Sequence, residues 1–224
     1  GNRLDAAWRR DEGDWVSPSG TLLQRSESDG NTNLYLPLTQ RDDAVYLYHM
    51  QAKMLSEGNN RRLGLHLFAS DGNSANRGDS YLIWLRFNQS EPGRVEVYRS
   101  ENNELPKFRE SQVIDLQRDR WYDLKVRYDP SSGEIEVFLD NASVLRWRDD
   151  KAPLRSGRYI SFRTGNAKVE FDDFRVYQRA SANPLPITVG PREMLRYQNR
   201  ARLYLLRQAG TRWGDLQVLE TRIR

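Results

Sequence analysis

Cysteine is absent from this chain of 224 residues, and histidine occurs only twice, at His49 and His66. The lack of thiols excludes disulfides, thiolate nucleophiles, iron–sulfur clusters and cysteine-ligated zinc. Two histidines are too few for a His-rich metal site. Apolar runs near the ~20 residues that cross a bilayer are also missing, so no membrane span is expected. Hydrophobic residues make up 38% and charged residues 29%, which is enough for a folded core.

Lysine is scarce as well, with 5 lysines against 30 arginines. The excess positive charge lies at the end of the chain, because residues 1–180 have a net charge of −1 and residues 181–224 a net charge of +5. A nucleic-acid-binding protein more often carries its positive charge as a patch on the folded body. We therefore expect no nucleic-acid partner.

Alternation of apolar and polar residues with period two dominates the first 180 residues. In residues 80–87 Tyr81, Ile83 and Leu85 alternate with Leu82, Trp84 and Arg86, and residues 44–54, 63–69, 94–99 and 121–128 alternate in the same way. In residues 63–69 this pattern places Phe68 on the side of His66, opposite the leucines. Such segments are typical of half-buried antiparallel strands. The turn sequence at 129–133 predicts a hairpin between residues 121–129 and 134–140.

Composition changes after residue 180. The stretch Ser-Ala-Asn-Pro-Leu-Pro at 181–186 is typical of a linker, and residues 187–191 and 215–219 resemble short strands. Residues 192–209 fit both a helical stripe and strand alternation, and we favour strands. We therefore predict one domain at 1–180, followed by a linker and a basic C-terminal β extension at 181–224.

A family resemblance follows from these strands. The segments 64–71 (GLHLFASD), 80–86 (SYLIWLR), 120–128, 134–140, 157–165 and 169–176 resemble strands of the concanavalin A-like lectin/glucanase jelly rolls, which include laminin G-like modules. The resemblance covers most of residues 8–178. It implies an all-β fold, an antiparallel two-sheet jelly-roll sandwich with a short C-terminal β extension. Because this fold hosts lectins, adhesion modules, glycosidases and lyases, it does not by itself imply one function.

The tail has its own resemblance. Val189-Gly190, Arg-Tyr-Gln-Asn at 196–199, and Ala209-Gly210 with Trp213 resemble a β segment that follows such jelly rolls in multidomain bacterial proteins of the envelope or the medium. This implies a secreted, periplasmic or cell-surface location, and other domains of a larger protein as partners.

Sugar binding needs aromatic rings that stack on apolar C–H faces, and planar groups that bond hydroxyls. Aromatic and arginine side chains alternate away from the expected core on several strands. If these strands are neighbours, they form one exposed patch, and we predict that a polysaccharide or glycan binds to His66, Trp84, Arg86, Tyr98 and Arg163.

Catalysis by a glycoside hydrolase needs two carboxylates across a cleft. Glu170 and Asp172 share a strand face, but Phe174 and Arg175 stand where glucanases of this fold carry a further glutamate. Glu134 and Glu136 form another same-face pair, which we interpret as a solvent-exposed strand face. A polysaccharide lyase of this fold would use a tyrosine and a histidine, yet the accompanying arginine-rich and Gln-x-His signatures are missing.

These patterns require no cofactor. The resemblance suggests one ion, a structural Ca²⁺, because many jelly rolls of this kind hold one. Asp71, Asn73 and Asp79 offer hard oxygen ligands in one loop, and Asp172 is a second option. The loop departs from an EF-hand because Ala75 occupies a ligand position. Asx turns without an ion explain the same residues.

The sequence thus predicts a non-catalytic carbohydrate-binding module of a secreted or cell-envelope bacterial protein. Two alternatives stay open. One is a glycoside hydrolase or polysaccharide lyase of the same fold. The other is a structural or protein-interaction module with no small ligand, in which residues 187–224 fill the concave face.

Overall fold

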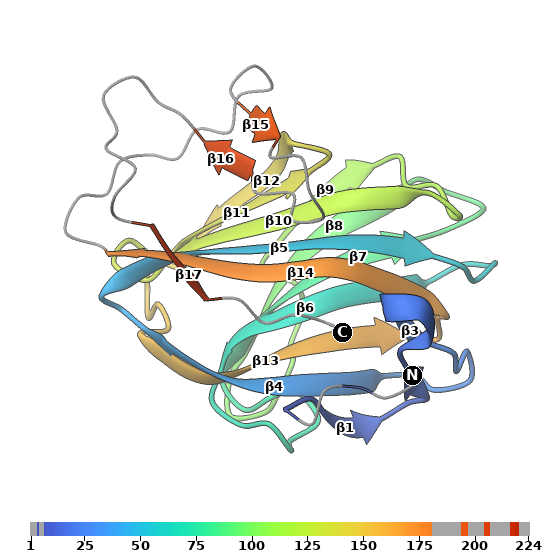
Figure 1. The fold of residues 1–224 in the computed structure, drawn as a ribbon, viewed down its shortest axis with the longest axis horizontal. Helices are drawn as coiled ribbons and strands as arrows, with labels where there is room; N and C mark the ends of the chain where they lie inside the picture. Colours follow the sequence, from blue (N-terminus) through green and yellow to red (C-terminus); the bar gives the residue numbers. More distant parts are fainter. Residues whose placement is uncertain (1–3, 5–6, 181–193, 197–203, 207–215, 220–224) are drawn as a thin grey trace.

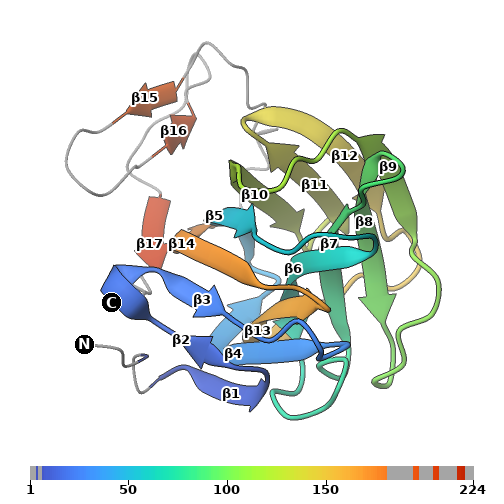
Figure 2. The same cartoon turned by 90° about the vertical axis from the view of Figure 1, so that its right-hand side faces the viewer.

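The computed structural model describes residues 4, 7–180, 194–196, 204–206 and 216–219. Two antiparallel sheets lie face to face (Figures 1 and 2). The first sheet has seven strands, in the spatial order β1 (Arg9–Glu12), β4 (Thr32–Arg41), β13 (Ser156–Gly165), β6 (Arg61–Ala69), β7 (Ser80–Phe87), β8 (Gly93–Ser100) and β9 (Glu110–Ile114).

The second sheet contains β12 (Ala142–Arg148), β11 (Glu134–Leu139), β10 (Trp121–Asp129), β5 (Ala44–Met54), β14 (Val169–Ala180), β3 (Leu22–Gln24) and β2 (Trp15–Val16), with β17 (Leu216–Leu219) paired to β14. A separate ribbon joins β15 (Met194–Arg196) and β16 (Tyr204–Leu206). In the described part of the chain the only helical element is the 3-10 turn η1 (Pro18–Gly20), so no described helix could span a membrane.

One apolar core lies between the sheets. Each long strand contributes every second residue, as with Tyr81, Ile83 and Leu85 on β7, which are all 0% exposed. Their counterparts on the second sheet include Leu124 and Val126 of β10. Burial of these alternate side chains provides the main driving force for the fold. The predicted all-β antiparallel sandwich and the hairpin of β10 with β11 are confirmed.

Phe68 departs from the predicted alternation. Its backbone is left-handed (φ 53°), and the pairing of β6 with β13 shifts at this point. The shift turns its ring into the core, where it meets the ring of Tyr128 edge-on at 4.7 Å between centroids. Gln40 holds this bulge, because its Oε1 accepts hydrogen bonds from the Phe68 N–H at 3.0 Å and from the Tyr48 hydroxyl at 2.6 Å. The period-two pattern was wrong here because a bulge adds a residue to one strand.

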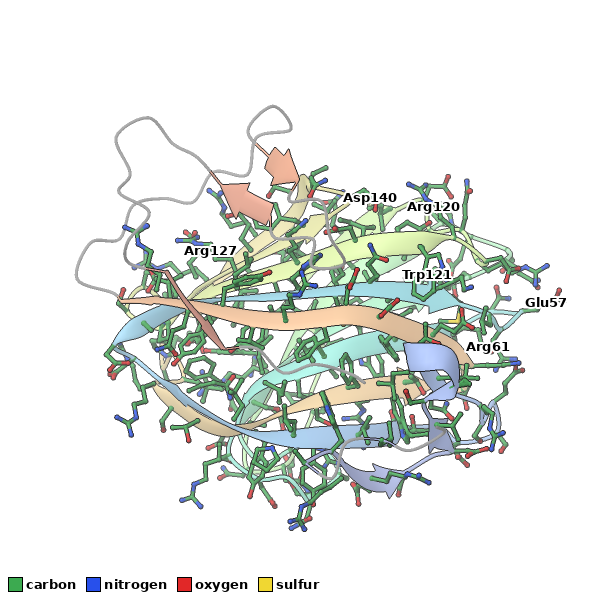
Figure 3. The ribbon with its side chains drawn as sticks, viewed as in Figure 1. Glu57, Arg61, Arg120, Trp121, Arg127 and Asp140 are labelled. Atoms are coloured by element: carbon green, nitrogen blue, oxygen red, sulfur yellow. The ribbon has the colours of Figure 1, made fainter. Side chains whose placement is uncertain are left out.

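The outer face of the second sheet is charged but largely buried. Glu136 is 2% exposed, and it accepts hydrogen bonds from Ser143 at 2.8 Å and from Arg146 at 2.7 Å. Arg127, labelled in Figure 3, bonds Glu134 at 2.7 Å. The prediction that Glu134 and Glu136 form a solvent-exposed face is therefore wrong for Glu136, since long arginine side chains cover its carboxylate.

The C-terminal part of the chain adds to the second sheet. Residues 176–179 of β14 pair with the strand β17, and β15 and β16 are strands within the segment 192–209. The linker predicted at 181–186 and the strand predicted at 187–191 lie outside the described residues.

Candidate functional site

Strand register brings the predicted binding residues onto the outer face of the seven-stranded sheet. Directly paired residues share one face of a sheet. Arg62 of β6 pairs with Arg86 of β7, which pairs with Arg94 of β8. Three arginines therefore form a row across three neighbouring strands.

Two further rows run parallel to this one. The second row follows β13, β6, β7 and β8 through Arg163, Gly64, Trp84 and Glu96. The third row includes His66, Leu82 and Tyr98. We call this surface the arginine face, and it comprises Arg62, His66, Trp84, Arg86, Arg94, Glu96, Tyr98 and Arg163.

Trp84 lies flat against β6 at the centre of the arginine face. A Cβ atom on Gly64 would stand 2.9 Å from the Cε3 atom of the indole, so the ring occupies the space that a side chain would take. The guanidinium carbons of Arg62 and Arg163 lie 5.3 and 5.7 Å from the ring centre. The indole ring of Trp84 thus makes cation–π contacts with both Arg62 and Arg163.

Arg163 and His66 form a buried pair beside this ring. Arg163 donates a hydrogen bond to His66 Nε2 at 3.0 Å, so the ring proton sits on Nδ1 and is donated to the Ser80 hydroxyl at 2.9 Å. Burial, with Arg163 and Arg77 nearby, lowers the pKa of His66 well below its usual value. Burial also lowers the pKa of Arg163 to about 10, with repulsion from Arg77 and Arg62. His66 is therefore a neutral acceptor for a charged arginine.

Arg86, Glu96 and Tyr98 form a second network on this face. Arg86 donates two hydrogen bonds of 2.9 Å to the two carboxylate oxygens of Glu96, and the Tyr98 hydroxyl donates to the same carboxylate at 3.0 Å. The bond to Glu96 raises the pKa of Arg86, and burial together with Glu96 raises that of Tyr98. Bidentate pairing fixes the guanidinium plane. Arg86 also donates to the Asn60 side chain, beyond the end of the sheet.

Exposure divides the five residues predicted from the sequence. The side chain of Arg86 is 22% exposed and Tyr98 is half-buried. His66, Trp84 and Arg163 are 0%, 1% and 3% exposed. The structure brings all five together, but the prediction that they form one exposed patch is wrong for these three, because neighbouring loops and Arg62 cover them.

Three further members of the arginine face, Arg62, Arg94 and Glu96, were not singled out from the sequence. Each lies an even number of residues from His66 or Tyr98 on the same strand, so strand parity carried the signal, but the pairing register that joins the strands was unknown. Phe108 lies beside the face, with its ring 6.2 Å from that of Tyr98 and 45% of the residue exposed. It follows β8 in a loop, where period two gives no signal.

The predicted metal ligands take part in hydrogen bonds within the protein. Asp71 accepts a hydrogen bond from the Asn73 N–H at 2.9 Å, and Asn73 accepts one from the Tyr35 hydroxyl at 2.8 Å. Asp79 accepts a hydrogen bond from the backbone N–H of Asn102, in the loop after β8, at 2.7 Å. Asp172 lies on β14 in the other sheet. Within the described residues no group of three acidic or histidine side chains has metal-site geometry, and the Asx-turn interpretation accounts for the loop.

The carboxylates weighed as catalytic groups have local partners. Glu170 pairs with Lys53 at 2.5 Å. Asp172 accepts a hydrogen bond from the Asp173 N–H at 2.7 Å, where a bulge with a left-handed Asp173 (φ 50°) interrupts the pairing with β5. The bulge means that the period-two spacing of Glu170 and Asp172 does not continue towards Arg175.

Comparison with solved structures finds many chains of the same architecture. The carbohydrate-binding module CBM66 from Bacillus subtilis superposes with a TM-score of 0.59 and 16% identity, covering 74% of this chain and 91% of that one. The potassium-bound carbohydrate recognition domain of Emp46p gives 0.58 and 15%, covering 74% and 86%. A galectin-like protein of unknown function from Bacillus subtilis gives 0.55 and 17%, covering 75% and 88%.

Sequence comparisons find no counterpart. No family model matches the chain, and no curated protein matches it. The likeness is therefore one of structure, at identities that establish architecture. The strand order, the two curved antiparallel sheets and these superpositions together show that the chain has the concanavalin A-like jelly-roll fold.

Proposed function

We propose that this chain is a non-catalytic glycan-binding module that takes its ligand on the arginine face. The observation that carries the proposal is the network of Arg86, Glu96 and Tyr98, whose Arg86 and Tyr98 are partly exposed beside the exposed ring of Phe108. The buried Glu96 carboxylate fixes a guanidinium and a hydroxyl in positions that match the donors and acceptors of a sugar ring. The aromatic ring beside them offers a surface for its C–H groups.

The structural neighbours support the same function. CBM66 and the Emp46p domain are named as carbohydrate-binding and carbohydrate-recognition domains. Glycosidic catalysis at this face is disfavoured, since Glu96 is the one carboxylate among the residues that define it and a glycosidase needs two. A module of this kind would act within a larger secreted or cell-envelope bacterial protein, next to a polysaccharide.

The buried members of the face would position the contacting ones. Trp84 supports Arg62, and His66 holds Arg163, which in turn lies over Trp84. A glycan would therefore touch Arg62, Arg86, Tyr98 and Phe108, while His66, Trp84 and Arg163 keep the surface rigid. Preorganised groups lose less entropy on binding than mobile ones do.

The test is a screen of the wild-type chain against neutral and acidic glycans, followed by calorimetry on each glycan that binds. Phe108→Ala removes an exposed ring next to the network and should weaken binding roughly tenfold, about 1.4 kcal/mol. Trp121→Ala is the matched control, because Trp121 is an exposed ring on the other sheet (Figure 3). If no glycan binds, or if both variants bind like the wild type, the proposal fails.

A further inference from the structure

We infer that the ligand of the arginine face is an acidic glycan, a polysaccharide that carries carboxylate or sulfate groups along its chain. The inference rests on the proposed function and narrows it to a substrate class. It starts from the positive charges that the strand register places on one surface. Residues 1–180 as a whole have a net charge of only −1, so this concentration of charge is local.

The arginine face has four arginines and one carboxylate. Glu96 is bound by Arg86. No ion pair joins Arg62, Arg94 or Arg163 to a carboxylate within the described part of the chain. These three guanidinium groups therefore have no directly paired carboxylate, although the charges of Glu96 and Glu12 act on Arg62 and Arg163 from a distance, and the neutral His66 adds no charge. An anionic ligand would supply the missing charge.

The row of Arg62, Arg86 and Arg94 destabilises the protein when no ligand is bound. Like charges directly opposite on neighbouring strands destabilise a sheet. Burial and the charge of Arg86 lower the pKa of Arg62, which shows the same repulsion. The Nε of Arg62 is buried and has no hydrogen-bond partner among the described atoms. One terminal nitrogen of the same guanidinium donates to the Gly30 carbonyl at 3.3 Å, so Arg62 has a neutral hydrogen-bond partner and no paired carboxylate.

The dimensions of the row fit an extended chain better than a single ion. Neighbouring strands are ~4.8 Å apart, so the backbones that carry Arg62 and Arg94 are separated by about 10 Å. Arg94 pairs with Val113 of β9, which is 49% exposed, so the row ends on an accessible sheet edge. Guanidinium groups bind carboxylate and sulfate-like oxyanions in the same two-pronged manner.

The experiment compares charged glycans with neutral glycans of the same backbone. Polygalacturonate is paired with its methyl ester, and dextran sulfate with dextran, and binding is measured by calorimetry at two salt concentrations. We expect the charged member of at least one pair to bind at least tenfold more tightly than its neutral partner, and the affinity to fall with salt. The two pairs distinguish a carboxylate from a sulfate as the bound group.

Substitutions of single arginines show which positive charges bind the acidic glycan. Arg62→Gln and Arg94→Gln should each weaken binding of the acidic glycan roughly tenfold. Arg155→Gln is the control, because it removes an equal charge from an exposed loop and should leave binding unchanged. Arg94→Gln guards against misfolding, since no hydrogen bond or ion pair joins the Arg94 side chain to another described residue, and thermal melting checks both variants.

The outcomes separate the two proposals. Equal binding of charged and neutral partners overturns the inference and leaves the glycan-binding function standing. Preference for the acidic glycan with unchanged binding by Arg62→Gln and Arg94→Gln also overturns it, because the charge then acts from elsewhere. Failure of every glycan to bind overturns the proposed function itself.

Discussion

His66 links the arginine face to the stability of the fold. Its ring is fully buried, accepts a bond from Arg163 and donates one to Ser80. Because burial lowers its pKa well below 6.5, the folded protein stays unprotonated at this site while the unfolded chain takes up a proton as the pH falls. This contribution to stability is complete above the unfolded pKa and is lost as the pH falls below it.

We therefore expect the free energy of unfolding to fall between about pH 7 and pH 5.5, by up to ~1.4 kcal/mol per pH unit below pH 6.5 for each such histidine. His66→Gln should keep an acceptor for Arg163 and remove one histidine's share of this slope. Urea unfolding at both pH values measures the change. His49, whose pKa is also lowered by burial, contributes the remaining share. Equal slopes for wild type and variant would contradict the assignment.

At the scale of strands, the period-two pattern predicted which side of a strand faces the core, because this follows from the geometry of an extended backbone. It gave the core side of β5, β7 and β10, because alternate residues of a strand always face opposite ways. It failed at Phe68 and at Asp173, where residues other than glycine adopt a left-handed backbone. These bulges depend on contacts with distant segments, such as Gln40 on β4 for Phe68, which a local pattern does not contain.

The candidate face depended on register in the same way. Trp84, His66 and Arg86 could be assigned to an outer side by parity, but the row of Arg62, Arg86 and Arg94 exists only because β6, β7 and β8 pair at those residues. Pairing is a tertiary property, so the excess of arginine in one place was invisible in a body with balanced charge.

Substitution of Gly64 tests the close contact between β6 and β7, against which the indole of Trp84 packs. A Cβ atom there would lie 2.0 Å from the Ile83 carbonyl oxygen and would also meet the indole of Trp84. Gly64→Ala should therefore push the strands apart and destabilise the protein by about 2 kcal/mol or more, measured by urea unfolding. Gly30→Ala, where a Cβ meets nothing within 4 Å, should be nearly neutral. Equal stability of the two variants would show that the strands adjust without cost.

At the scale of the whole molecule, both outer faces of the sandwich are polar and yet mostly sealed. Glu136 on one side and His66 on the other are 2% and 0% exposed. Alternation tells which residues leave the core, but loops and long arginine side chains decide whether they reach water. The exposure expected for the predicted sugar-binding residues therefore failed for His66, Trp84 and Arg163 and held only in part for Arg86 and Tyr98.

The C-terminal extension gives the last prediction. Its strand β17 bonds to β14, at the second sheet, whereas the arginine face is the outer side of the first sheet. A chain that ends at Ala180 should keep its β-sheet circular dichroism and lose thermal stability, because residues 176–179 become an unpaired edge. Its affinity for the glycan should stay within about threefold of the full chain, since the contacting residues are all retained.

This truncation also separates local from overall charge. Residues 181–224 carry a net charge of +5, so the shortened chain has a net charge of −1. Retained binding of an acidic glycan by a chain of net negative charge, weakened by salt and by Arg62→Gln, would assign the attraction to the arginine face. Loss of binding on truncation, with the fold intact by circular dichroism, would instead place the ligand on the extension.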